Sequence, residues 1–309
     1  MWRVEADVHF ERSRRRFLER SNPLQMEEPD FVDRYRFPKT VVTQLSRELD
    51  PYLSHHTRRS NSLTVEQQVC VALRYYAEGD YMRELGDLHG ISEMSAGRAV
   101  HDVSNALSEV HHRFICWPTS QEISMEKERF YRYCGMPKTI GCIDGTQIRI
   151  LAPAVNEKVY VNRKGWHSIN CQIICDSNLK IFDISPKWPG SSHDAFILRN
   201  SAAWTHVQAL SDCWLLGDSA YPLLPSLMKP YITPTNRAQE KFNKSLSKGR
   251  SSVERCIGIF KSRFRCLSKT DVFSSKMFSH YPCLCSFTQH GTRCQLSSRS
   301  SIRRSQRKP

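Results

Sequence analysis

The sequence lacks several patterns that would place it in common protein classes. It contains 12 cysteines but no C-x-x-C pair, so no redox motif or paired zinc motif is present. Two cysteines and two histidines between residues 280 and 290 have a spacing that zinc sites do not use. The N-terminal residues carry charges throughout and have no apolar core, unlike a secretory signal peptide. No apolar run approaches membrane-spanning length, so we expect no membrane partner and reduced thiols in the nucleus and cytoplasm.

Acidic residues are also scarce. The chain has 31 Asp and Glu residues against 45 Lys and Arg residues, a formal net charge of +14. This excess favours a polyanionic partner, and nucleic acid fits best, whereas a basic protein without such a partner is the alternative. The hydrophobic fraction of 39% excludes a disordered chain, and 309 residues suffice for one large domain or two ordinary ones.

The first half of the chain has the period of helices. We expect a basic segment over residues 1–30 and a helical region over residues 31–135, beginning with an apolar stripe over residues 31–52. Capping residues up to Thr64, followed by Glu66 and Gln67, predict a helix that ends at Gly79.

Residues 81–107, YMRELGDLHGISEMSAGRAVHDVSNAL, have the pattern of a helix-turn-helix. Gly90 permits the turn, and Ser92 can cap the second helix. That helix would present Arg98 and His101 outward, as candidate DNA-binding residues. An ordinary helical hairpin would have the same pattern, so both interpretations stay open.

From residue 136 the period changes to that of strands. Strands are predicted at residues 141–151, 166–176, 179–186 and 214–217, with a tight turn at Ser177 and Asn178. Helices are predicted at residues 194–200, 240–248 and 252–265. This order indicates an α/β fold with a ribonuclease H-like mixed sheet behind the N-terminal all-α, helix-turn-helix-like region.

Four acids recur in this half of the chain. They are Asp144 in GCIDGTQIRI, Asp194 in GSSHDAF, Asp218 in LLGDSAYPLLP and Glu254 in SSVERCIGIFKSRF. A carboxylate on a buried strand is costly unless it is paired or binds a metal, and Mg²⁺ prefers such oxygen ligands. Simpler roles stay open: a strand-end turn for Asp218, a helix cap for Asp194 and a first-turn position for Glu254.

Three neighbouring features add to this pattern. Gly145 predicts a bulge or tight bend directly after Asp144, while Asp176 and Asp183 are expected to be solvated. Lys261 and Arg265 follow Glu254 by seven and eleven residues, which predicts a basic row on its helix face for DNA phosphates. Arg163 and Lys164, next to Trp166, are expected either to contact DNA and stack on an unpaired base or to form a plain basic loop around a core tryptophan.

With these motifs in order, the chain resembles the PIF/Harbinger transposase family, and within it the vertebrate harbinger transposase-derived nucleases. The resemblance rests on ALRYYAEGDYMRELGDLHGIS, GCIDGTQIRI, YVNRKGWHSINCQIICD, GSSHDAFILRNS, LLGDSAYPLLPSLMKPY and SSVERCIGIFKSRFRCL, spread over residues 31–267.

The resemblance implies a ribonuclease H-like DDE endonuclease domain over residues 136–270. It implies that Asp144, Asp194, Asp218 and Glu254 bind Mg²⁺ or Mn²⁺ and that Asp144, Asp218 and Glu254 carry the catalysis. It also implies DNA as substrate and a Myb-like DNA-binding partner protein that imports the chain into the nucleus.

The chain departs from the family after residue 267. Residues 271–309 form an atypical basic tail without the apolar helix that the family has there. This departure keeps open a catalytically inactive protein that binds DNA or a partner. His193 next to Asp194 suggests a third class, a phosphohydrolase of small esters, but no matching set of further histidines is found.

Overall fold

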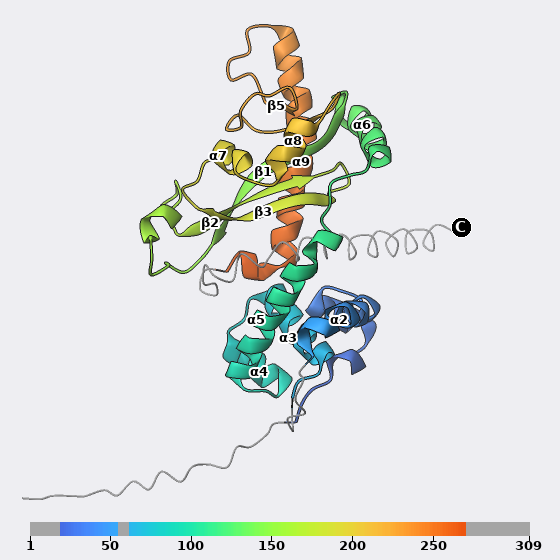
Figure 1. Cartoon of the computed structure of the whole chain (residues 1–309), viewed down its shortest axis with the longest axis vertical. Coiled ribbons are helices and arrows are strands. Elements are labelled where there is room, and N and C mark those ends of the chain that lie inside the picture. The colour runs from blue at the N-terminus through green and yellow to red at the C-terminus, as the bar shows by residue number, and fades with distance from the viewer. Residues whose placement is uncertain (1–18, 55–61, 270–309) are drawn as a thin grey trace, which may run out of the picture.

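A computed structural model of the chain describes residues 19–54 and 62–269. Most of the predicted N-terminal segment and the whole predicted tail, with its cysteines and histidines, lie outside these residues. In Figure 1 a group of N-terminal helices lies below a sheet, and one long helix, α9, passes along the sheet and down to those helices.

The N-terminal region is helical, as predicted. After a short 3-10 turn at Pro23–Gln25, it contains α1 (Glu28–Tyr35), α2 (Lys39–Leu53), α3 (Val65–Glu78), α4 (Met82–His89) and α5 (Glu93–Val110), followed by a 3-10 turn at His111–Arg113. The single stripe expected over residues 31–52 is therefore two helices. The helical conformation is interrupted at Arg36, which has a φ of 67°, and Pro38 then precedes α2.

The local helix signals are confirmed. Thr64 and Gln67 form a reciprocal capping box at the start of α3, and Gly79 ends that helix with a left-handed φ of 67°. Gly90 has a φ of 66° between α4 and α5, and the Ser92 side chain caps α5. Residues 82–110 thus form two helices joined by a short turn, which fits both a helix-turn-helix and an ordinary helical hairpin.

The second region contains a five-stranded mixed sheet, which confirms the α/β expectation. Its strands are β1 (Thr139–Arg149), β2 (Ser168–Cys175), β3 (Ile181–Pro189), β4 (Trp214–Leu216) and β5 (Leu227–Met228), in the order β3-β2-β1-β4-β5. β1, β2 and β3 are antiparallel neighbours, whereas β4 runs parallel to β1 and to β5. β4 pairs with β1 only as far as Cys142, so the later part of β1 has an edge that β4 does not cover.

Helices cover both faces of this sheet. α6 (Ser120–Cys134) and α9 (Arg237–Arg263) pack on one face, and α7 (Asp194–Arg199) and α8 (Ala203–Ala209) on the other; a 3-10 turn at Glu157–Tyr160 precedes β2. The two helices predicted at residues 240–248 and 252–265 are one helix. Gly249 lies inside it, and a Cβ there would come within 2.5 Å of Leu216 Cδ1, so the glycine lets Leu216 of β4 pack close to the helix.

The C-terminal end of α9 packs into the N-terminal region. Phe264 is fully buried against Phe37 and Phe260, and the Arg263 guanidinium lies 5.0 Å from the Phe37 ring centroid. The next turn, η4 (Arg265–Leu267), lies against the end of α3, where Cys266 Cα would be 2.9 Å from a Cβ on Gly79. One buried apolar cluster therefore contains residues of both regions, and the boundary near residue 135 stays a prediction.

Two carboxylates expected in solvent are instead structural. Asp176 is 8% exposed and accepts hydrogen bonds from the backbone N–H groups of Asn178 and Lys180, which closes the predicted turn between β2 and β3. Asp183 accepts a hydrogen bond of 3.0 Å from the Trp117 indole. The sequence pattern did not predict either role, because an aspartate next to a turn looks the same in the sequence whether its side chain is buried or exposed. Among the described helices, none is long and apolar enough to span a membrane.

Candidate active site

Asp144 lies in the middle of β1 and points toward α9. Its carboxylate is 3.4 Å from the Arg250 guanidinium, and its side chain is only 19% exposed. Burial raises the pKa of Asp144 to about 6; Arg250 opposes this rise, whereas the charges of Asp218 and Asp194 add to it. The ionised form of Asp144 is therefore unfavourable at this position, because the carboxylate is buried and the charges of two other acids act on it.

Gly145 marks the place where Asp194 packs against β1. A Cβ on this residue would come within 2.4 Å of Asp194 Oδ1, so Asp194 lies against β1 on the face opposite Asp144. Asp218 follows β4 beyond the last β4 pairing and interacts electrostatically with both other acids. The bulge predicted at Gly145 is wrong: the β1–β2 register runs unbroken through this residue, and the irregularity in β1 falls between Thr139 and Gly141.

Asp194 is the first residue of α7 and not its cap. The N-cap position belongs to His193, and Asp194 Oδ1 instead accepts a hydrogen bond of 3.0 Å from the Asn170 side chain. Burial raises the pKa of Asp194, and this hydrogen bond opposes the rise. The helix-cap interpretation is thereby excluded. Asp218 does hold the turn after β4, because it accepts a hydrogen bond of 2.9 Å from the Ala220 N–H, but its charge also acts on Asp144.

Glu254 lies deep inside α9, which begins at Arg237, so it is not a first-turn glutamate. Its side chain is 58% exposed and lies 3.8 Å from Arg250, one turn earlier on the same helix. Arg250 thus contacts both Glu254 and Asp144 and partly neutralises them. Sequence reasoning missed this arginine, although its position four residues before an acid on a helix was a usable signal.

The chemistry of the site fits a divalent cation, although its ligands are not preassembled. All four acids offer carboxylate oxygens, the donors that Mg²⁺ and Mn²⁺ prefer. Beside them, Asn170 Oδ1 and Tyr221 Oη are buried without a hydrogen-bond partner in the described structure. In the described part of the chain, no three His, Cys, Asp or Glu side chains are grouped closely enough to hold one metal ion. The predicted cluster of Asp144, Asp218 and Glu254 therefore stays a prediction.

Tyr221 is a second residue that sequence reasoning missed. It is 1% exposed, and the charges of Asp194, Asp144 and Asp218 act on its phenol. Burial, followed by these three charges, raises the pKa of Tyr221 well above its usual value, so the phenol stays protonated and able to donate. The sequence offered one signal only, its place three residues after Asp218.

Replacing Tyr221 by phenylalanine is expected to slow cleavage by about 10- to 100-fold, because a hydrogen bond to a charged group contributes roughly 1.5–3 kcal/mol. Stability should stay within about 1 kcal/mol, since the hydroxyl has no partner in the described structure. Nicking rates and thermal melts measure the two effects. Tyr76→Phe is the control: its hydroxyl bonds Ser104 at 2.6 Å in the helical region, so it should lose stability but not activity. Equal nicking by Tyr221→Phe and the parent would contradict a role beside the acids.

The predicted DNA-binding residues fall into separate groups. Arg98 and His101 are exposed on α5, as expected. Arg163 lies close enough to Asp194 to influence its pKa. Lys164 is exposed on the adjacent loop, and Lys261 donates a hydrogen bond of 2.7 Å to the Gln147 carbonyl of β1.

Arg265 is not part of a basic row on the Glu254 helix face. α9 ends at Arg263, and the chain then turns, so Arg265 is directed to α3 and pairs with Glu78 at 3.0 Å. The helical spacing that predicted the row does not extend this far. Contact of any of these residues with DNA stays a prediction.

Comparisons with known proteins identify a family and several relatives of this chain. The family described as "DDE superfamily endonuclease" matches residues 143–288. The chain is 37% identical over 236 residues to the human protein "Putative nuclease HARBI1", covering 75% of this chain and 68% of that protein. The Xenopus laevis protein of the same name is 33% identical over 239 residues, covering 76% of this chain and 69% of that protein. "Protein ALP1-like" of Arabidopsis thaliana is 28% identical over 228 residues, which cover 67% of this chain and 55% of that protein. No solved structure matches.

Proposed function

Because the chain belongs to the family of harbinger transposase-derived DDE superfamily endonucleases, we propose that it cleaves DNA phosphodiester bonds with a divalent metal ion. The observation that supports this best is that Asp194 packs against Gly145, next to Asp144, while the charges of Asp194 and Asp218 both raise the pKa of the buried Asp144. Burial and mutual repulsion make such carboxylates unfavourable in their ionised form. Carboxylates in this situation are typical of a site that binds a cation, because the positive charge offsets the repulsion.

Each part of the site has a role in this proposal. Asp144, Asp194, Asp218 and Glu254 would hold Mg²⁺ or Mn²⁺. When bound, the ion would supply Lewis-acid charge beside the phosphate and lower the pKa of water.

The chain's own residues position the substrate. Arg250 balances the acids from α9, the protonated Tyr221 phenol is available to donate a hydrogen bond beside them, and Asn170 fixes the orientation of Asp194. Cations on the 163–164 loop and on the later part of α9 would hold the DNA backbone near the cut.

The helical region extends the proposal to DNA recognition. Arg98 and His101 are exposed on the second helix of the helix-turn-helix arrangement, the position from which such helices enter the major groove. A DNA substrate would place the protein in the nucleus as well as the cytoplasm, and a Myb-like partner would assist import and DNA binding. Co-purification of a tagged full chain with a Myb-like protein tests this part.

The second candidate is a protein that binds DNA or a partner without cutting. Its supporting observation is Arg250, which already pairs with Asp144 and Glu254, together with the lack of a preassembled ligand group in the described residues.

Plasmid nicking separates the two candidates. With Mg²⁺ or Mn²⁺, the full chain is expected to convert supercoiled plasmid to the open circle, and EDTA should stop the reaction. Asp218→Asn should lose the activity by on the order of 10³-fold, because removal of one member disables residues that act together. Asp212→Asn, at the other end of β4, is the control, since Asp212 pairs with Lys127 and Lys138 away from the acids. Plasmid binding without nicking would favour the second candidate.

A further inference from the structure

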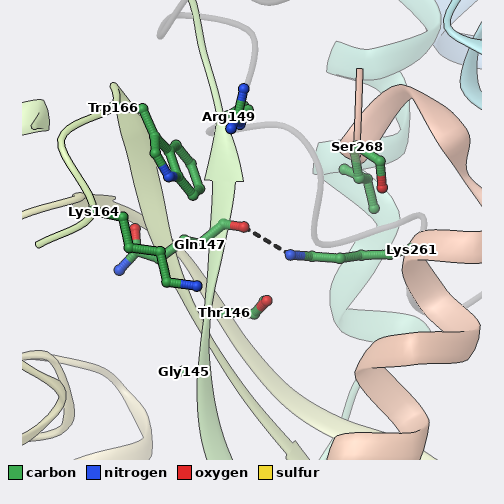
Figure 2. Close-up of a pocket in the computed structure, with 9 residues that line it drawn as sticks. Gly145, Thr146, Gln147, Arg149, Lys164, Trp166, Lys261 and Ser268 are labelled. Atoms are coloured by element: carbon green, nitrogen blue, oxygen red, sulfur yellow. Dashed lines mark hydrogen bonds between the residues drawn. The ribbon is translucent and has the colours of Figure 1, made fainter. Parts of the chain in front are cut away.

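A pocket of about 360 Å³ lies beside the acids, further along β1. Gly145 belongs both to this pocket and to the contact with Asp194. Figure 2 shows Lys164 and Lys261 approaching β1 from opposite sides, with Trp166 and Arg149 further along the strand. We refer to this site, lined by Gly145, Gln147, Arg149, Lys164, Trp166 and Lys261 among others, as the basic pocket.

The cations of the basic pocket lack acidic partners. Arg149, Lys164 and Lys261 form no ion pair with an Asp or Glu among the described residues, whereas many other basic side chains of this chain do. Burial lowers the pKa of Lys261, and the charge of Lys164 lowers it further, so the two ammonium groups repel each other across the pocket. Such a pair is stabilised by an anion placed between them.

The aromatic wall of the basic pocket is held in place. The Arg149 guanidinium lies 4.7 Å from the Trp166 ring centroid, and the ring is only partly buried. The buried Asn162 side chain accepts hydrogen bonds from the backbone N–H groups of Lys164, at 2.9 Å, and Trp166, at 3.5 Å. A fixed indole next to cations is the arrangement on which nucleobases stack.

The distance to the acids suits a nucleic-acid strand. A strand rises about 3.3 Å per residue, so Gln147 lies roughly 10 Å beyond Asp144 along β1. One strand of B-DNA advances about 3.4 Å per nucleotide, so this distance corresponds to on the order of three nucleotides. A single pocket with one aromatic face and a volume near the small end for ligand sites fits one base rather than a duplex.

We propose that the basic pocket binds one unpaired nucleotide of a DNA strand, a few positions from the cut, with its base on Trp166 and its flanking phosphates at Lys164 and Lys261. This inference rests on the proposed function, because it takes DNA as the substrate. It goes further by requiring that the DNA be locally unpaired next to the acids, so that a fully paired duplex is the weaker ligand.

The test measures binding by fluorescence anisotropy in EDTA, where no cutting can occur. The probes are a short DNA duplex with one bulged nucleotide, the same duplex fully paired, and an RNA duplex with the same bulge. The parent is expected to bind the bulged DNA duplex most tightly. Trp166→Ala should weaken that binding by about 5- to 150-fold, the range for loss of one stacked base, and change binding of the paired duplex by less than about twofold.

Two further variants complete the test. Trp166→Phe keeps an aromatic face and should retain most of the preference for the bulged duplex. Lys164→Gln should reduce the salt dependence of binding by about one phosphate contact. Lys187→Gln is its control, because Lys187 is also a lysine beside a tryptophan, lying over the Trp188 ring on β3, but it does not line the pocket.

Specific outcomes would overturn the proposal. They are equal loss of paired and bulged binding in Trp166→Ala, no loss in either, or equal or tighter binding of the bulged RNA by the parent. Because the measurement needs no metal, a chain that fails to nick plasmid can still show the bulge preference. A chain that nicks plasmid but does not prefer the bulged duplex would support the proposed function and contradict the role proposed for the basic pocket.

Discussion

Replacing Asp144 by asparagine is expected to abolish metal-dependent cleavage and, at the same time, to raise the melting temperature of the metal-free protein. Cleavage should fall by on the order of 10³-fold or more, because the acids act as a unit. The gain in stability has a separate cause. Burial raises the pKa of Asp144 from an ordinary 3.8 to about 6, so the folded chain holds a proton there more tightly than the unfolded chain.

The sign of the pH dependence follows from this shift. The stability that the protonated Asp144 contributes is fully present below about pH 4 and is lost as the pH rises through about 6. At neutral pH the ionised carboxylate therefore costs up to roughly 3 kcal/mol, a figure that already includes the opposing attraction of Arg250. We expect a net gain of about 1–2 kcal/mol, or about 2–8 °C, for Asp144→Asn at pH 7.5, vanishing near pH 4.

Asp176→Asn is the matched control for this experiment. Its pKa is also raised to about 6 by burial, but it closes the β2–β3 turn and interacts with Glu126 rather than with the acids of the site. An asparagine oxygen can accept the same two backbone N–H groups. This variant should gain stability with the same pH dependence and keep both cleavage and the rise in melting temperature on adding Mn²⁺. An Asp144→Asn protein that is still stabilised by Mn²⁺ as strongly as the parent would remove Asp144 from the metal ligands.

Replacing Phe264 by alanine is expected to lower stability by about 3–5 kcal/mol, the usual range for a buried phenylalanine, and the melting temperature by roughly 10 °C. Phe264 has no exposed surface and packs between Phe37 and Phe260, where α9 enters the helical region. The helical region and the sheet should therefore melt together. Hydrogen exchange in α3 should become faster to the same extent as in α9.

Phe242→Ala provides the comparison on the same helix. Phe242 lies near the start of α9, is half-buried and stacks edge-on with Tyr231, so its loss should cost about 1 kcal/mol. If Phe264→Ala cost no more than Phe242→Ala, or if the melt separated into two steps, the junction between the two regions would not carry the stability assigned to it.

The sequence predicted those parts of the fold that depend on local chemistry. Thr64, Gly79 and Ser92 have short-range roles as caps and stops, and each was placed correctly. The strand pattern around Asp144 was equally visible, because a buried strand needs apolar neighbours.

The predictions from sequence were wrong or incomplete where the role of a residue depends on a contact with a residue far away in the sequence. Gly249 resembles a helix breaker but lets Leu216 pack close to α9, and Gly145 resembles a bulge but makes room for Asp194. Arg250 and Tyr221 complete the site through contacts that only the folded chain creates. For the same reason, the end of α9 and the pairing of Arg265 with Glu78 could not be predicted from helical spacing.

The packing of η4 against α3 has a consequence for biosynthesis. The ribosome makes the helical region first, but Phe264, Cys266 and Leu267 belong to the same buried cluster and are made last among the described residues. More than 150 residues separate the end of α5 from Leu267, which at about 5–20 residues per second is a delay of roughly 10–30 s. During that interval, Phe37 and the end of α3 have no cover, so the nascent chain has an apolar surface that a chaperone would have to protect until α9 arrives.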